Sequence, residues 1–168
     1  MLKQDGSDFR QIIEDHSRPL YAHIRSIVLN HQDADDVLQN TFIKAWTNRE
    51  SFRGDSELQT WLFRIATNEA LQHLRKNRIR NLFFLRNENL KPDPYEPASQ
   101  QDGERIKEKL EEAMKRLSPQ QRIVFSMKYF NELKYSQMAE ILQLAEGTLK
   151  ATYHQAAKKI EQYLLENE

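Results

Sequence analysis

ELQTWLFRIATNEALQHL, residues 57–74, is the stretch that decides the fold class. Apolar residues recur along it at helical spacing, and they fall on two sides of a helix rather than on one. The two sides are Leu58, Trp61, Leu62 and Ile65, and Phe63, Ala70 and Leu74. A helix that is apolar on two sides needs neighbours on both, so this stretch predicts the centre of a helical bundle.

The composition agrees with an all-α protein. The 168 residues include only four glycines and five prolines, whereas 30% of them are charged, and good helix formers are frequent. Cysteine is absent, which excludes a disulfide framework, a zinc finger and a thiol nucleophile within this sequence. The sequence starts without an apolar signal core and holds no apolar run long enough to span a bilayer, so we expect a cytoplasmic protein.

Further helices are predicted before the opening stretch. Ser7 is expected to cap a first helix, and Ser17 with Pro19 is expected to start a second one. Asp33 is a candidate N-cap for a third helix that runs to Trp46.

A proline-rich segment divides the chain. Residues 91–103 hold three of the five prolines and no aliphatic residue larger than alanine, which predicts a linker over 91–105. Basic and acidic residues nearly balance on each side of it, so neither half is a basic tail. We therefore expect two small helical domains, residues 1–90 and 106–168, joined by a flexible linker.

The second half carries the pattern of a helix-turn-helix. After a first amphipathic helix from Ile106 to Leu117, SPQQ at 118–121 combines a capping serine, a proline at the first helical position and a glutamine three residues after the cap. A short helix over 135–142 then leads to a longer one from Thr148 to about Leu165. Ala139 is small enough for the two helices to cross closely.

One side of the last helix is a candidate DNA-reading face. If Leu149, Tyr153, Ala156 and Ile160 face inward, the opposite side presents Lys150, Ala151, His154, Gln155 and Lys158. The two ammonium groups suit phosphates, and histidine and glutamine suit base edges. An ordinary solvated helix face has the same composition, and the pattern alone leaves that alternative open.

The first half offers a second candidate surface. Arg75, Lys76, Arg78 and Arg80 form the densest basic cluster of the chain. Trp61 and Phe63 suit stacking on unpaired bases as well as core packing, and the turn at Gly54 lets backbone approach a ligand closely.

Catalytic patterns are missing. The histidines at positions 16, 23, 31, 73 and 154 are scattered, and the sequence contains no HExxH, GxxxxGK or GxSxG motif. Asp33, Asp35 and Asp36 fit helix capping and a polar protein-binding surface better than a divalent ion. We expect no enzyme activity, no catalytic residue, no cofactor and no metal.

Taken in order, three stretches resemble the sigma-70 superfamily of bacterial RNA polymerase sigma factors, specifically the short extracytoplasmic-function (ECF) type. DADDVLQNTFIKAW (33–46) resembles the helix that grips the polymerase clamp. SFRGDSELQTWLFRIATNEALQHLRKNR (51–78) resembles the segment that recognises and melts the minus-10 element. Residues 117–164 resemble the domain whose helix-turn-helix reads the minus-35 element.

The resemblance implies site residues position by position. Core polymerase contacts are implied at Asp36, Gln39 and Phe42. Minus-10 contacts are implied in a lid over a flipped base, in the pocket below it and along the basic segment, at Phe52, Arg53, Gly54, Asp55, Ile65, Asn68, Arg75, Lys76, Arg78 and Arg80. Minus-35 contacts are implied at Thr148, Lys150, Ala151, His154, Gln155 and Lys158.

The implied function is that of an alternative sigma factor, whose partners are promoter DNA and the clamp and flap of the polymerase core. Family members are often held inactive by an anti-sigma factor, and that partner stays open for this chain. Two departures concern the turn of the helix-turn-helix: Gln143 stands where glycine is usual, and Ala145 where a capping serine is usual. The rivals are a stand-alone helix-turn-helix regulator and a polymerase-binding adaptor that does not read promoters.

Overall fold

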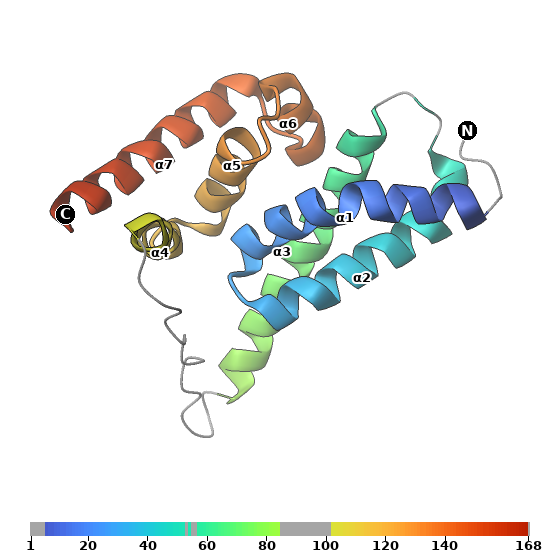
Figure 1. The fold of residues 1–168 in the computed structure, drawn as a ribbon, viewed down its shortest axis with the longest axis horizontal. Coiled ribbons are helices and arrows are strands. Elements are labelled where there is room, and N and C mark those ends of the chain that lie inside the picture. The colour runs from blue at the N-terminus through green and yellow to red at the C-terminus, as the bar shows by residue number, and fades with distance from the viewer. Residues whose placement is uncertain (1–5, 53, 55–56, 85–101, 168) are drawn as a thin grey trace.

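The computed structural model describes residues 6–52, 54, 57–84 and 102–167. These residues form α-helices and one short 3-10 helix, and the described part contains no strand, which confirms the expected all-α class (Figure 1). The elements are α1 (Gly6–Val28), α2 (His31–Thr47), η1 (Arg49–Ser51), α3 (Leu58–Phe84), α4 (Asp102–Lys115), α5 (Pro119–Tyr129), α6 (Tyr135–Leu142) and α7 (Glu146–Glu166).

The first three helices form a bundle with α3 at its centre. Each of them packs against the other two, and Leu62 and Phe63 of α3 are completely buried. Leu20 and Ile24 of α1 are buried in the same core, which explains why α3 needs apolar residues on two sides. The bundle predicted from residues 57–74 is confirmed.

The prediction of a helix start at Pro19 is wrong, because α1 runs without a break from Gly6 to Val28 with Pro19 inside it. An interior proline removes one backbone hydrogen bond and disfavours the helix by about 3 kcal/mol. Leu20, Ile24 and Ile27 follow it on one face and are completely buried. Their burial, at roughly 1.5–3 kcal/mol for each side chain, outweighs the penalty of one proline.

The predicted cap of the α2 helix is also displaced. The N-cap is Asn30, whose Oδ1 accepts a hydrogen bond from the backbone N–H of Asp33 at 2.9 Å. Asp33 lies in the first turn, where a carboxylate is favourable near the positive end of the helix dipole. Its Oδ1 also lies 3.2 Å from Nε2 of His73 and so connects the start of α2 to α3.

Local sequence signals predict most of the helix starts and ends in the second half of the chain. Ser118 and Gln121 form the predicted capping box, with both hydrogen bonds at 3.2 Å. α6 has the predicted bounds, and α7 starts two residues before the predicted Thr148. α4 starts at Asp102, inside the range expected to be linker, and the rest of that range lies outside the described residues.

The two halves pack directly on each other, which the sequence did not predict. α5 lies against α1 and α6 lies against α3, as Figure 1 shows. Ile123, Val124 and Met127 of α5 belong to the same buried cluster as Ile24 and Phe63 of the first half. A smaller second core is formed within the second half by Ala113, Met114, Leu117, Phe125, Ala156 and Ile160.

Candidate nucleic-acid and polymerase-binding surfaces

α7 has the predicted division between a buried and an exposed side. Leu149, Ala156 and Ile160 are buried, and Tyr153 is half-buried against Phe125 at a ring separation of 5.7 Å. The predicted reading face is exposed at every position, namely at Thr148, Lys150, Ala151, His154, Gln155 and Lys158. The structure therefore presents these six side chains together on one surface.

Within the protein, the ammonium group of Lys150 on this face makes only weak contacts. Lys150 Nζ lies 3.9 Å from a carboxylate oxygen of Glu146 and 5.6 Å from the ring centre of Tyr135. Exposed pairs of this kind contribute little to stability, so the ammonium group stays available for a phosphate.

The turn between α6 and α7 contains both departures from the family pattern, Gln143 and Ala145. Gln143 adopts a left-handed conformation with φ of 55°, a region where glycine is preferred. Its Nε2 donates a hydrogen bond to the backbone oxygen of Glu140 at 2.7 Å, which holds the turn. Ala145 caps α7 without any side-chain hydrogen bond. The helix-turn-helix keeps its geometry with two unfavourable residues.

The candidate minus-10 surface lies on α3 and on the turn before it. Asn68 is exposed and Ile65 is half-buried one turn earlier. The ring of Phe52 lies 5.2 Å from the ring of Trp61 in α3, and Gly54 has φ of +78°, a left-handed conformation that favours glycine. Arg53 and Asp55 of the proposed lid lie outside the described residues.

Polar contacts hold α3 in place beneath this surface. Lys44 of α2 forms an ion pair with Glu69, the neighbour of Asn68. On the inner side, Thr67 Oγ1 lies 2.9 Å from Nε2 of the completely buried His23. Burial lowers the pKa of His23 to about 3, although a hydrogen-bonding interaction with Asn131 acts in the opposite direction. His23 is therefore neutral at physiological pH.

The basic cluster continues the same helix. Arg75, Lys76, Arg78 and Arg80 are all exposed on the second half of α3. They follow Asn68 by two to three turns, so a strand that passes Asn68 can meet positive charge further along the helix.

The candidate polymerase surface lies on α2. Asp36 and Gln39 are exposed, whereas Phe42 is 9% exposed and packs edge-on against Phe9 at a ring separation of 6.5 Å. The clamp contact predicted for Phe42 thus falls on a side chain that the core already covers.

Two exposed apolar residues of α2 were not predicted from the sequence as candidate binding residues. Ile43 is 62% exposed and Trp46 is 36% exposed, and Arg49 lies over the Trp46 ring at 4.2 Å. Both lie on the helix that carries Asp36 and Gln39. Large exposed apolar side chains on one element are typical of a protein-binding surface.

The described residues contain no group of three or more histidine, cysteine, aspartate or glutamate side chains suited to hold a metal ion. Across the same residues, no helix has the length and apolar character that a membrane crossing requires.

Comparisons with known proteins give two separate family matches along the chain. Residues 12–79 match the family described as Sigma-70 region 2, and residues 107–160 match Sigma-70, region 4. The RNA polymerase sigma factor YlaC of Bacillus subtilis (strain 168) is 31% identical over 154 residues, which cover 88% of this chain and 88% of that protein. The ECF RNA polymerase sigma factor SigW of the same organism is 25% identical and covers 96% of this chain and 91% of its own.

Solved structures give the same result. The sigma factor RpoE of Bartonella quintana, determined in complex with the anti-sigma factor NepR, superposes with a TM-score of 0.79 at 28% identity. The alignment covers 94% of this chain and 96% of that chain, so the likeness includes both halves and their relative placement.

Proposed function

Since this chain belongs to the sigma-70 family of RNA polymerase sigma factors, in its ECF group, it acts as an alternative sigma factor that directs RNA polymerase to promoters, and we propose how its surfaces divide that task. The observation that carries the proposal is the pair of family matches: the first contains the candidate surface of α2 and most of the one on α3, and the second contains the reading face of α7.

The first domain, residues 1–90, binds the polymerase clamp through α2 in this proposal. Asp36 and Gln39 supply polar contacts, and the exposed Ile43 and Trp46 supply apolar area. Apolar and aromatic side chains at the centre of an interface usually carry most of its affinity. Phe42 supports this surface from the core.

The same domain recognises the minus-10 element through α3. A base that leaves the stack needs a pocket that offsets a few kcal/mol of lost stacking. Phe52 to Asp55 form the lid, Ile65 and Asn68 form the floor, and Trp61 supports them through its contact with Phe52. The basic residues from Arg75 to Arg80 hold the phosphates of the melted strand.

The second domain, residues 106–168, reads the minus-35 element. Lys150 and Lys158 contact phosphates and His154 and Gln155 meet base edges in the major groove, while Thr148 and Ala151 border that contact. The linker over 91–105 spans the two elements.

The chain itself performs no chemical step, because the polymerase core carries out the synthesis of RNA. It works in the cytoplasm with that polymerase, without a cofactor. An anti-sigma factor is a further partner in this proposal, supported by the likeness to a sigma factor solved in complex with one.

Reconstitution with core polymerase tests the function. We expect the purified chain to bind core polymerase in a pull-down and to start transcripts at specific sites on sheared genomic DNA, as identified by sequencing of the RNA 5′ ends. A folded chain that does not bind core polymerase at low salt contradicts the proposal. Tight binding to palindromic duplex DNA without polymerase would instead indicate a stand-alone regulator.

A further inference from the structure

Arg49 connects two candidate surfaces of the first half. It is the first residue of η1, the short 3-10 helix that leads from α2 to Phe52. Its guanidinium carbon lies 4.2 Å from the ring centre of Trp46, and its Nη1 donates a hydrogen bond of 2.9 Å to the backbone oxygen of the same residue. The side chain of Arg49 is thus bound to the last turn of α2, on a residue that the proposed function places against the polymerase clamp.

The backbone of Arg49 makes a contact in the other direction. Its carbonyl oxygen accepts a hydrogen bond of 3.3 Å from the backbone N–H of Phe52, whose ring lies 5.2 Å from that of Trp61. Trp61, Ile65 and Asn68 follow one another at helical spacing and therefore lie on one face of α3. Phe52 thus lies at one end of the face that carries the proposed base pocket.

We propose that Arg49 is a positioning residue, which holds Phe52, the first residue of the lid, in a fixed place relative to the polymerase-binding surface of α2 and to the base pocket on α3. This proposal rests on the function proposed above. It adds to that function a residue that acts through Phe52 and not by direct contact with DNA. Loss of the Arg49 side chain should therefore impair promoter opening while polymerase binding is kept.

The end of α2 is a fixed base for Arg49. Asn48 donates two hydrogen bonds of 2.9 Å to the backbone oxygen of Lys44, one from its backbone N–H and one from Nδ2. The last carbonyl groups of a helix have no partner within it, and these bonds satisfy one of them. Lys44 in turn forms an ion pair with Glu69 of α3. Since α2 is tied to α3 in this way, the contact of Arg49 with α2 also fixes η1 relative to α3.

The surroundings of Arg49 suit a fixed side chain. Arg49 is half-buried, its Nε has no hydrogen-bond partner among the described residues, and none of the ion pairs in that part of the chain includes it. A guanidinium over an aromatic ring is stabilised by the negative face of the ring, and the gain is larger where water is excluded. Trp46 is itself held by an edge contact with Phe9 at a ring separation of 5.0 Å. Arg49 differs in these respects from the basic cluster of α3, whose side chains are exposed.

Fluorescence of Trp61 tests the position of Phe52 in the free chain. The chain has two tryptophans, so Trp46→Phe leaves Trp61 as the only reporter and keeps a ring and a backbone oxygen for Arg49 to contact. In this background, Arg49→Ala should raise the quenching of Trp61 by acrylamide about twofold, because the Phe52 ring no longer packs on it. Arg49→Gln keeps a planar group with an N–H donor but has no charge, and it should restore most of the protection.

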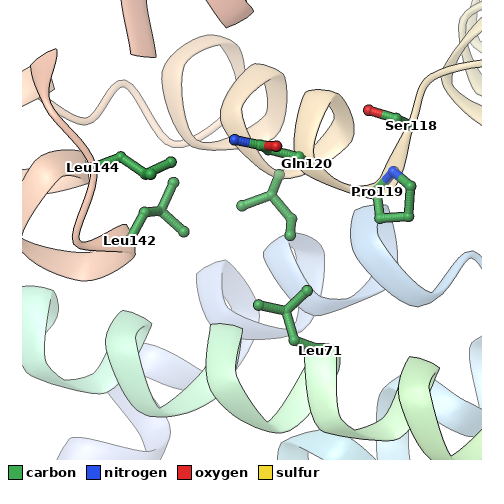
Figure 2. A pocket seen from close by; sticks show the side chains of 7 residues that line it. Leu71, Ser118, Pro119, Gln120, Leu142 and Leu144 are labelled. Atoms are coloured by element: carbon green, nitrogen blue, oxygen red, sulfur yellow. The ribbon is translucent and has the colours of Figure 1, made fainter. Parts of the chain in front are cut away.

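Two controls separate positioning from a general loss of stability. Arg116→Ala removes the same kind of contact in the second half, where the guanidinium carbon lies 4.5 Å from the ring centre of Tyr163. Leu71→Ala enlarges a pocket of about 480 Å³ further along α3, where Figure 2 shows Leu71 beneath Leu142 and Leu144. The second control should lower the urea midpoint of unfolding, as large-to-small substitutions beside a cavity do. Both controls should leave the quenching unchanged.

Transcription with core polymerase connects the position of Phe52 to function. Arg49→Ala should lower the yield of RNA from sheared genomic DNA about tenfold, because a displaced lid contributes less to the capture of a flipped base. The amount of core polymerase recovered in a pull-down should stay the same, and Arg49→Gln should recover most of the RNA yield. If Arg49 instead contacted a phosphate, both variants would lose activity equally, because neither carries the charge. Equal losses therefore overturn the positioning role.

The fluorescence and the transcription results separate this proposal from the function on which it rests. Unchanged quenching of Trp61 in Arg49→Ala, or an equal rise in the Leu71→Ala control, overturns the positioning role and leaves the sigma function in place. If the unmodified chain gives no transcripts with core polymerase, the sigma function is wrong, and the effect of Arg49 on promoter opening is wrong with it.

Discussion

The two helices that carry the candidate DNA-binding surfaces, α3 and α7, differ in what lies against them. The reading face of α7 is exposed at every predicted position, whereas the stripe of α3 that contains Asn68 is flanked by Glu140 and Leu142 of α6. Both faces are built on a helix whose other side is buried in the core. The difference therefore lies in the packing of one half on the other.

Acid should break the packing behind α3, and this is the largest effect that we expect. The pKa of His23 falls from 6.5 to about 3 because burial disfavours the imidazolium, so the folded protein binds fewer protons than the unfolded chain between these values. The contribution is complete above pH 6.5 and is lost as the pH falls toward 3. Each pH unit in this window lowers the free energy of unfolding by about 1.4 kcal/mol.

Urea unfolding across this pH window measures the effect. His23→Gln should reduce the slope of stability against pH by the amount of one proton, while the exposed His154→Gln should leave it unchanged. A slope that is identical in His23→Gln and in the unmodified chain would show that His23 does not titrate on unfolding.

Removal of the Asn68 side chain should affect promoter opening more than polymerase binding. Asn68→Ala is expected to weaken capture of the melted strand by about 1–3 kcal/mol, because one contact to an unstacked base is lost. Permanganate reactivity of the promoter reports opening, and a pull-down reports polymerase binding. Gln72→Ala is the control, since Gln72 is exposed one turn further along α3. Equal losses in both assays would contradict the base-pocket assignment.

Removal of one lysine charge from the exposed reading face of α7 should change the binding of duplex DNA. Lys150→Ala and Lys158→Ala are each expected to lower the salt dependence of duplex binding by about one phosphate contact. Lys159 is the control, because its Nζ contacts Gln121 Oε1 at 3.1 Å on another side of the helix. If the salt dependence changes only in the Lys159→Ala variant, the DNA does not contact the face of α7 that carries Lys150 and Lys158.

The smallest effect concerns the turn that sets the angle of α7. Gln143→Gly should relieve the left-handed conformation, and Ala145→Ser should supply the missing cap, each with a gain of about 1 kcal/mol. Thermal unfolding measures both variants. Ala145→Val has no oxygen to cap the helix and should not stabilise the protein; a gain equal to that of serine would exclude capping as the cause.

Much of this architecture follows from local signals in the sequence. The capping box at Ser118, the bounds of α6 and the inward side of α7 depend on neighbouring residues, and all were predicted. Pro19 misled the prediction because a local helix breaker is outweighed by burial on the same face of α1. The cap of α2 was misplaced by three residues because several aspartates compete with Asn30 for that role.

The contact between the halves had no local signal. Ser26 and Ser126 are 100 residues apart in sequence, and small polar residues leave no periodic pattern. The pairing of Arg64 with Glu140 likewise appears only once α6 lies against α3. Trp46 was predicted only as the end of the third helix, and Ile43 was not singled out. The exposure of both depends on where the bundle leaves α2 uncovered.

Transcription with reconstituted core polymerase tests the central claim most directly. The account predicts that addition of this chain to core polymerase creates new RNA 5′ ends at specific sites on sheared genomic DNA. An unchanged set of 5′ ends on addition of the folded chain would contradict a promoter-directing function.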